Sequence, residues 1–178
     1  MYLLIESDMT TDKNSIKVGD LLVDSDQIYK VYSVEHDGKE EDGKNRKLLN
    51  YRPLSRDGKH DSLTCSIPEV NMFKAGLRRP LTKEQIELFM GELQKKTDDS
   101  LGIDYKLVKE VLFLNDPLKT APLLKQLWGN KGKGDVYSRT DEELLESILH
   151  HLVAEIAMVL NISEEKALQK IEKSGKKH

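Results

Sequence analysis

Apolar and polar residues alternate along the first third of the chain, a pattern typical of short β-strands. From Tyr29 onward this alternation places Tyr29, Val31 and Ser33 on one predicted face, with Lys30, Tyr32 and Val34 on the other. Turn-forming clusters separate the apolar segments. The predicted strands cover residues 21–23, 29–35, 46–54 and 62–67.

The connections between these strands carry the signature of hairpin turns. Asp37-Gly38 and Asp42-Gly43 lie in a polar loop over residues 36–45, and Asp57-Gly58 precedes the last strand. Four short strands joined in this way predict an antiparallel meander. A strongly twisted meander of this size tends to curl into a small barrel of the SH3 or Tudor kind.

After Pro80 the apolar spacing changes to the helical period. Thr82 to Gln85 forms a capping box before a first helix, and Thr140 to Glu143 is predicted to form a second one before the longest helix. Asp116 and Pro117 suit the N-cap and first position of another helix, which Pro122 is expected to shorten or kink. Further helices are predicted over residues 103–114 and after Ser163.

These patterns together predict an α+β protein of two parts. Residues 1–80 are expected to form a small antiparallel β-barrel, Tudor-like or SH3-like, and residues 81–178 an all-helical bundle. A wide apolar stripe marks the longest helix as the centre of the bundle. The length of 178 residues is compatible with two small domains.

Composition narrows the functional classes. The chain has 28 Lys and Arg against 31 Asp and Glu, a net charge of −3, so there is no global basic field and any nucleic-acid contact must come from a local patch. No apolar run approaches the ~18 residues of a membrane span, and the N-terminus lacks a signal-peptide pattern. The single cysteine, Cys65, indicates a reducing, cytoplasmic compartment and is interpreted as a buried structural thiol.

No set of residues indicates catalysis. His150 and His151 are neighbours on a helix and point about 100° apart, which is unfavourable for sharing a metal ion. Acidic pairs such as Glu142-Glu143 lie at helix starts, where they oppose the helix dipole. We therefore expect no enzyme activity, no cofactor and no metal.

A glycine- and lysine-rich segment, Gly129 to Gly134, leaves two interpretations open. It is either a surface loop or a non-specific phosphate contact made by Lys131, Lys133 and Arg139. Its spacing is not that of a P-loop, and it follows a predicted helix. Trp128, the only tryptophan, is either a core residue or a base-stacking one, and its place at the end of an apolar helix favours the core.

Three stretches of the chain, taken in order, resemble one family. They are the opening Lys17 to Asp20, the segment Ile67 to Arg78 before a capped helix, and the segment Leu152 to Ala167. Their order and spacing resemble the CarD/CdnL family of bacterial transcription regulators over roughly residues 16–173. The resemblance implies a Tudor-like N-terminal domain that binds the RNA polymerase β subunit. It also implies a helical domain that contacts promoter DNA and stabilises the open complex by wedging an apolar ring into the minor groove.

The resemblance assigns site residues to both parts. For polymerase it implies the last two strands, with Arg46, Leu48, Asn50, Tyr51, Leu63, Thr64 and Ser66 as contacts. For DNA it implies Leu101, Lys106, Lys131, Lys133 and Arg139.

Two positions depart from the family pattern. Leu101 stands where the family has its wedge tryptophan, and Ser66 stands where an arginine is expected beside the Ile-Pro step. The start of the long helix is also acidic, with Asp141 to Glu143. An alternative hypothesis is therefore a protein-interaction adaptor that has the same fold but has lost DNA binding.

Overall fold

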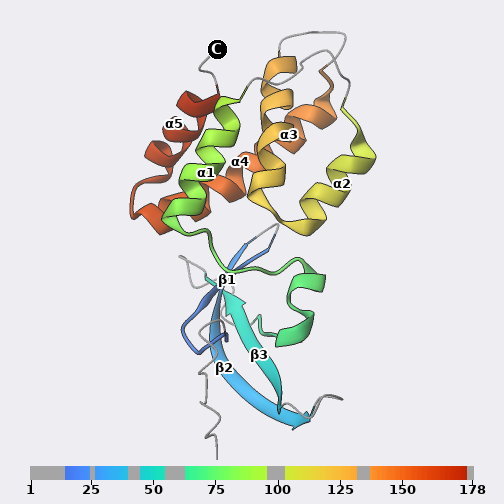
Figure 1. Ribbon diagram of the computed structural model, residues 1–178, viewed down its shortest axis with the longest axis vertical. Helices are drawn as coiled ribbons and strands as arrows, with labels where there is room; N and C mark the ends of the chain where they lie inside the picture. Colours follow the sequence, from blue (N-terminus) through green and yellow to red (C-terminus); the bar gives the residue numbers. More distant parts are fainter. Residues whose placement is uncertain are drawn as a thin grey trace, which may run out of the picture.

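The computed structural model describes residues 15–24, 27–39, 45–54, 63–95, 103–131 and 137–175. Within them the protein is α+β, with a four-stranded antiparallel sheet followed by five α-helices, as predicted (Figure 1). The strands are β1 (Leu21–Val23), β2 (Ile28–Lys39), β3 (Asn45–Pro53) and β4 (Cys65–Pro68). Each strand pairs with the next in the order β1-β2-β3-β4, so this sheet is open and a closed barrel is not shown.

Strand β2 is longer than predicted and changes face along its length. It continues to Lys39, so Asp37 and Gly38 lie within the strand and not in a loop. A register shift between Val31 and Ser33 accommodates one extra residue, a β-bulge. As a result Val34 pairs with Leu49 and packs on the sheet core together with Tyr29, and the strict alternation predicted from the sequence is wrong beyond Val31.

Two short 3₁₀ turns, η1 (Glu69–Asn71) and η2 (Phe73–Ala75), follow β4. Met72 between them is buried in the core of the sheet part. Gly76 ends η2 at φ 73°, where glycine is favoured. A Cβ atom at this position would lie 3.1 Å from the carbonyl oxygen of Phe113, so the glycine also permits close contact with the helical half. The buried core of the sheet part consists of Ile16, Leu22, Val31, Leu49, Met72 and Leu77.

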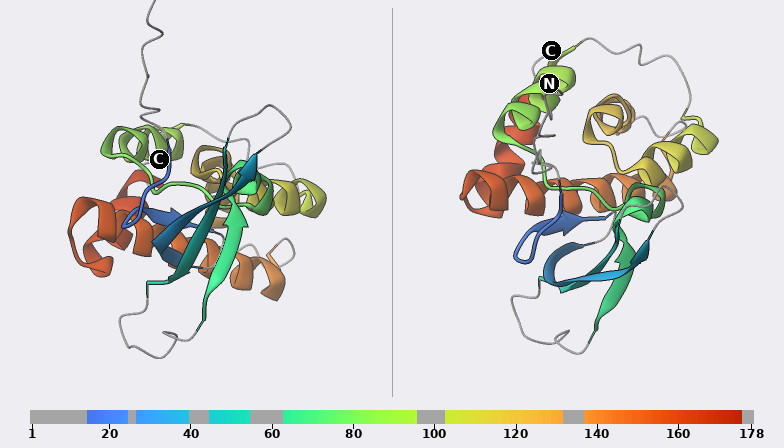
Figure 2. Two further views of the ribbon diagram at one scale, coloured as in Figure 1. Left: turned by 90° about the horizontal axis from the view of Figure 1, so that it is seen from below. Right: turned by 60° about the horizontal axis from the view of Figure 1, so that its bottom comes forward.

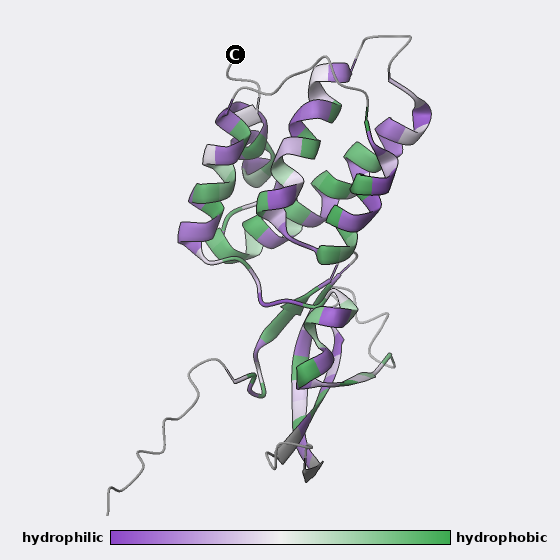
Figure 3. Cartoon of the chain, turned by 45° about the vertical axis from the view of Figure 1, so that its right-hand side comes forward, coloured by the Kyte–Doolittle hydropathy of each residue, from purple (hydrophilic) through white to green (hydrophobic). Residues whose placement is uncertain are grey.

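The helices are α1 (Lys83–Gln94), α2 (Tyr105–Leu114), α3 (Pro117–Asn130), α4 (Arg139–Leu160) and α5 (Glu164–Gly175). Figure 2 shows α4 as the helix that lies against the sheet. Hydrophobic and hydrophilic residues alternate along the helices, as amphipathic packing requires (Figure 3). The largest fully buried side chains of this half are Phe89, Leu93, Leu124, Leu127, Leu145, Ile156 and Ile171.

Helix caps explain most of the boundaries. The predicted capping box at Thr82 and Gln85 is confirmed, as is the Asp116 cap with Pro117 in the first turn. The predicted box at Thr140 is wrong, because Ser138 is the cap and Asp141 its partner. Pro122 lies within α3 without dividing it: the helix extends to Asn130.

Trp128 packs against the helical core, as the favoured interpretation predicted. Cys65 is a free thiol of intermediate burial, so it is less buried than predicted. Over the described residues, no helix alone has the length and apolar character needed to cross a membrane, and α4 and α5 meet that criterion only as a pair bent by 112°.

Candidate functional site

The sheet and the helical half are joined at one polar junction, which we define as Arg78, Asn115 and Glu155 with the backbone of Val23 and Gly76. Arg78 follows the last 3₁₀ turn and forms an antiparallel bridge with Val23 at the end of β1. The Val23 amide donates to the Arg78 carbonyl at 2.8 Å, and the Arg78 amide donates back to Val23 at 3.0 Å. The chain entering the helical half is thereby tied to the edge of the sheet.

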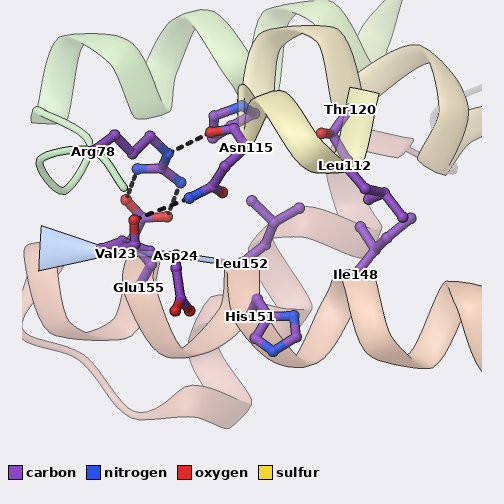
Figure 4. A pocket seen from close by; sticks show the side chains of 11 residues that line it. Val23, Asp24, Arg78, Leu112, Asn115, Thr120, Ile148, His151, Leu152 and Glu155 are labelled. Atoms are coloured by element: carbon purple, nitrogen blue, oxygen red, sulfur yellow. Dashed lines mark hydrogen bonds and ion pairs between the residues drawn. The ribbon is translucent and has the colours of Figure 1, made fainter. Parts of the chain in front are cut away.

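The side chain of Arg78 reaches into the helical half. Its Nη1 and Nη2 donate to the two carboxylate oxygens of Glu155 in α4 at 2.5 and 2.7 Å (Figure 4). Glu155 is only 1% exposed, and its Oε1 also accepts from the Leu81 amide at 2.7 Å. A bidentate guanidinium–carboxylate pair with further hydrogen bonds is the arrangement that offsets the desolvation of a buried charge.

Asn115, in the turn between α2 and α3, connects this turn to Arg78 and to the backbone of Val23 and Gly76. Its carbonyl accepts from Arg78 Nε at 2.6 Å, and its side-chain Nδ2 donates to the carbonyls of Val23 and Gly76, both at 3.0 Å. Asn115 adopts the left-handed conformation at φ 48°, which asparagine tolerates better than most residues. Four segments distant in sequence thus converge on one hydrogen-bonded cluster, represented by Val23, Arg78, Asn115 and Glu155 (Figure 4).

A small pocket beside this cluster gives no room for a substrate. Its volume is about 40 Å³, space for a few water molecules at most. Its walls include Leu112, Ile148, His151 and Leu152 besides the junction residues (Figure 4). The geometry therefore indicates a mechanical role, in which the junction sets the orientation of the sheet relative to the helices.

Metal chemistry finds no support in the described part of the chain. No group of three or more His, Cys, Asp or Glu side chains there is arranged to hold a metal ion. His150 and His151 have their ring centroids 5.5 Å apart in an edge-on arrangement.

The predicted polymerase contacts lie in different environments on and beside β3 and β4. Asn50 is only 6% exposed. Its Nδ2 donates to Glu35 at 2.7 Å, and its Oδ1 accepts from the Ser66 hydroxyl. These three residues form a polar ladder across β2, β3 and β4. Asn50 therefore orders the face of the sheet and has almost no surface for a partner.

Tyr51 lies on the core face of the sheet. Its ring stands edge-on to Tyr29 with centroids 5.2 Å apart, and burial raises the pKa of the Tyr51 phenol. Burial, together with the hydrogen bond to Asp24, raises the pKa of Tyr29 far above its usual range. Both phenols stay neutral and pack on the core of the sheet part, and Tyr51 is half-buried.

The remaining predicted polymerase contacts lie at the outer side of the sheet. Leu63 is 50% exposed, Thr64 and Ser66 are exposed, and Leu48 is half-buried. Arg46 is a residue of β3 whose side chain lies outside the described part. Of the predicted polymerase contacts whose side chains are described, Leu63, Thr64 and Ser66, with the half-buried Leu48, therefore offer surface to a partner.

Three of the predicted DNA contacts lie at one end of the helical half, with acids beside them: Lys106 at the start of α2, Lys131 at the end of α3 and Arg139 at the start of α4. The Tyr105 hydroxyl at the start of α2 donates to Asp141 at 2.7 Å, which ties the starts of α2 and α4 together. Lys106 follows on α2 and is exposed. Leu101 and Lys133 lie outside the described residues.

Two of the cations at this end pair with acids of α4. Lys131 Nζ lies 4.0 Å from Glu142, and Arg139 Nε lies 3.0 Å from Glu143. These are exposed pairs of little energetic value, yet they reduce the positive potential that a phosphate would meet.

Asp141 adds a further negative charge at the same end. Burial alone would raise its pKa, but hydrogen bonds from the Ser138 backbone, the Tyr105 hydroxyl and the Ser138 side chain lower the pKa below its ordinary value. The carboxylate is therefore charged near neutral pH.

Sequence reasoning missed the junction, although its signals are present. Glu155 is an acid within the apolar stripe of α4, and a charge in that position needs a buried partner. Asn115 precedes Asp116 and Pro117, a setting that suits a left-handed residue between helices. The identity of the partner, Arg78, depends on tertiary structure and was not predictable.

Neither a model of a known protein family nor a curated protein matches this chain. The resemblance to the CarD/CdnL family therefore rests on the residues quoted for it and remains a prediction.

Proposed function

We propose that this protein is a transcription regulator that docks on the β subunit of RNA polymerase through its sheet and presents its helical half to promoter DNA, as the CarD/CdnL resemblance implies. The observation that carries the proposal is the junction. Arg78, Asn115 and Glu155 hold the sheet and the helical bundle in one orientation. A regulator that positions one macromolecule relative to another needs such a rigid connection.

The outer side of the sheet suits a protein partner. Strand β4 pairs with β3, and no other strand in the described ranges pairs with its free edge. Such an edge offers unpaired backbone groups to an added strand. Leu63 beside it supplies exposed apolar surface, and the ladder of Glu35, Asn50 and Ser66 keeps the neighbouring face ordered.

Substituting Leu63 with glutamate is expected to weaken binding to the polymerase β subunit at least about tenfold, because a desolvated charge replaces an apolar contact. Affinity of the full-length protein for purified β subunit would be measured by biolayer interferometry. The control is Leu88→Glu: Leu88 lies on α1 and is 59% exposed, close to the 50% of Leu63. Equal affinities for the two variants would exclude β4 as the docking edge.

A second candidate function, an adaptor without DNA binding, is favoured by the pairing of Lys131 with Glu142 and of Arg139 with Glu143. Both partner acids lie in α4 close to its start. Under this hypothesis the protein binds polymerase through the sheet and a second protein through the helices.

DNA binding separates the two candidates. The regulator is expected to shift a promoter fragment at low salt, and reversing Lys131, Lys133 and Arg139 to glutamate together should abolish the shift, because phosphate contacts supply the salt-dependent part of the affinity. Reversal of Lys17, Lys30 and Lys74, all outside the helical half, makes the same change in net charge and serves as control. Absence of any shift by the unmodified protein would favour the adaptor.

A further inference from the structure

Helices α1 and α5 run side by side at the edge of the bundle (Figure 1). Side chains of these two helices and of the end of α4 line a groove that shares no residue with the junction. The hollow measures about 390 Å³, within the roughly 300–1,000 Å³ range of small-molecule sites. Its lining comes from α1, the end of α4 and the last turns of α5, and consists of Lys83, Ile86, Glu87, Met90, Leu160, Lys170, Lys173 and Ser174.

The floor of this groove is apolar. Ile86 is buried, and Met90 and Leu160 are partly buried against the helical core. Methionine is flexible and polarisable, so Met90 can adapt its side chain to an apolar guest. From Lys83 to Met90 the wall along α1 extends about 10 Å at 1.5 Å per residue. The groove can thus hold an extended apolar body.

The rim of the groove is cationic. Lys83, Lys170 and Lys173 are exposed, and none of them forms an ion pair with another residue in the described ranges. Glu87 is the one acid in the lining. Lys83 is also the first residue of α1, where the helix dipole is positive.

This concentration of positive charge contrasts with the rest of the molecule. The chain as a whole carries a net charge of −3, and at the predicted DNA site Lys131 and Arg139 are paired with acids. The three lysines outnumber the one acid of the lining, Glu87, so the hollow carries a net positive charge that attracts an anion. The chemistry of the groove therefore complements a molecule that is apolar along its body and anionic at its head.

We propose that the α1–α5 groove binds a small organic acid with an apolar chain, of which a medium-chain carboxylate is the simplest example. The chain lies on Ile86, Met90 and Leu160, and the carboxylate pairs with the ammonium groups of the rim. This site lies outside both predicted macromolecular contacts, so it does not depend on the function proposed above.

Sodium octanoate is the probe for this proposal, and the methyl group of Met90 is the reporter. In full-length protein labelled at the methionine methyl groups with ¹³C, octanoate is expected to shift the Met90 resonance saturably. The Met72 resonance, from the core of the sheet part, should not move. Assignment follows from Met90→Leu. Octylammonium has the same chain and the opposite charge, and we expect it to bind at least about tenfold more weakly, because the three lysines of the rim repel its head group.

Charge reversal supplies the second arm of the experiment. Reversing Lys83, Lys170 and Lys173 to glutamate together is expected to weaken octanoate binding at least about tenfold, whereas the same reversal at Lys17, Lys30 and Lys74 should leave it unchanged. The proposal would be overturned if octanoate and octylammonium bound equally well, or if octanoate binding did not saturate. It would also be overturned if charge reversal in the groove left octanoate binding unchanged. A glutamate-rich peptide that shifts Met90 when octanoate does not would also overturn it and assign the groove to a protein partner.

Discussion

Substituting Arg78 with alanine is expected to lower the free energy of unfolding by about 3–5 kcal/mol, the cost of removing one partner from a buried ion pair. The change leaves Glu155, 1% exposed, with the Leu81 amide as its remaining hydrogen bond at the junction. It also removes the donor to the Asn115 carbonyl. Urea unfolding of the full-length protein, followed by circular dichroism, measures the difference.

The neighbouring arginine provides the matched control. Arg79 pairs with Asp20 at the surface, with side chains 44% and 30% exposed, against 15% and 1% for Arg78 and Glu155. Arg79→Ala is therefore expected to cost about 1 kcal/mol or less. Replacing both Arg78 and Glu155 by apolar residues, as in Arg78→Met with Glu155→Leu, should recover most of the loss, because no charge then remains buried. Similar losses for Arg78→Ala and Arg79→Ala would contradict a special role of the buried pair.

Substituting Asn115 with alanine is expected to cost about 2–5 kcal/mol. Two hydrogen bonds to the carbonyls of Val23 and Gly76 are lost, each worth about 0.5–1.5 kcal/mol, and those carbonyls are left with fewer donors. The left-handed backbone at φ 48° adds about 1–2 kcal/mol of strain for alanine. The same urea titration measures the loss.

Alanine substitution at Asn161 is the control that separates the cost of backbone strain from the cost of losing the Asn115 side chain. Asn161 ends α4 at φ 53°, and it is exposed. Asn161→Ala is therefore expected to cost about 1–2 kcal/mol, the strain alone. Asn115→Gly removes the strain but also the amide, so it should lie between the unmodified protein and Asn115→Ala. If alanine had the same effect at both positions, the hydrogen bonds donated by the Asn115 side chain would contribute nothing to stability.

Elements whose signals are local were predictable from the sequence. The Thr82 and Asp116 caps are read directly from residues three or fewer positions apart, and the structure confirms both. The helix start at residue 139 was misplaced because Thr140 and Ser138 are both good caps, and tertiary contacts decide between them. Tyr105 on α2 bonds to Asp141 and so favours the Ser138 box.

Features that depend on pairing between distant segments were less predictable. The bulge near Val31 reverses the face of Val34, and no turn residue marks it. The sequence around Asn50 is that of an ordinary strand, and its hydrogen bonds to Glu35 and Ser66 depend on the pairing of three strands. The same limit applies to the candidate site, because the partners of Arg78 lie 37 and 77 positions away.

The junction also has a consequence for the proposed function, because it links the position of the helical half to that of the sheet. If the junction holds, binding of the sheet to one partner fixes the position of α2 and α4, on which Lys106 and Arg139 lie. A change at Arg78 then alters the presentation of the helical half without changing the surface of β4. We therefore expect a variant at Arg78 to lose regulation but to keep its binding to polymerase.

Native-state hydrogen exchange of the full-length protein tests the central claim, that the sheet and the helical half are one rigid body, most directly. The informative amides are those of Val23 and Arg78, which bridge β1 to the joining segment, and of Leu81, which donates to Glu155. We predict that their free energies of opening lie within about 1 kcal/mol of the value for Phe89 in the helical core. Exchange of these three amides at rates near those of an unstructured peptide, while Phe89 stays protected, would show a flexible linker and contradict the account.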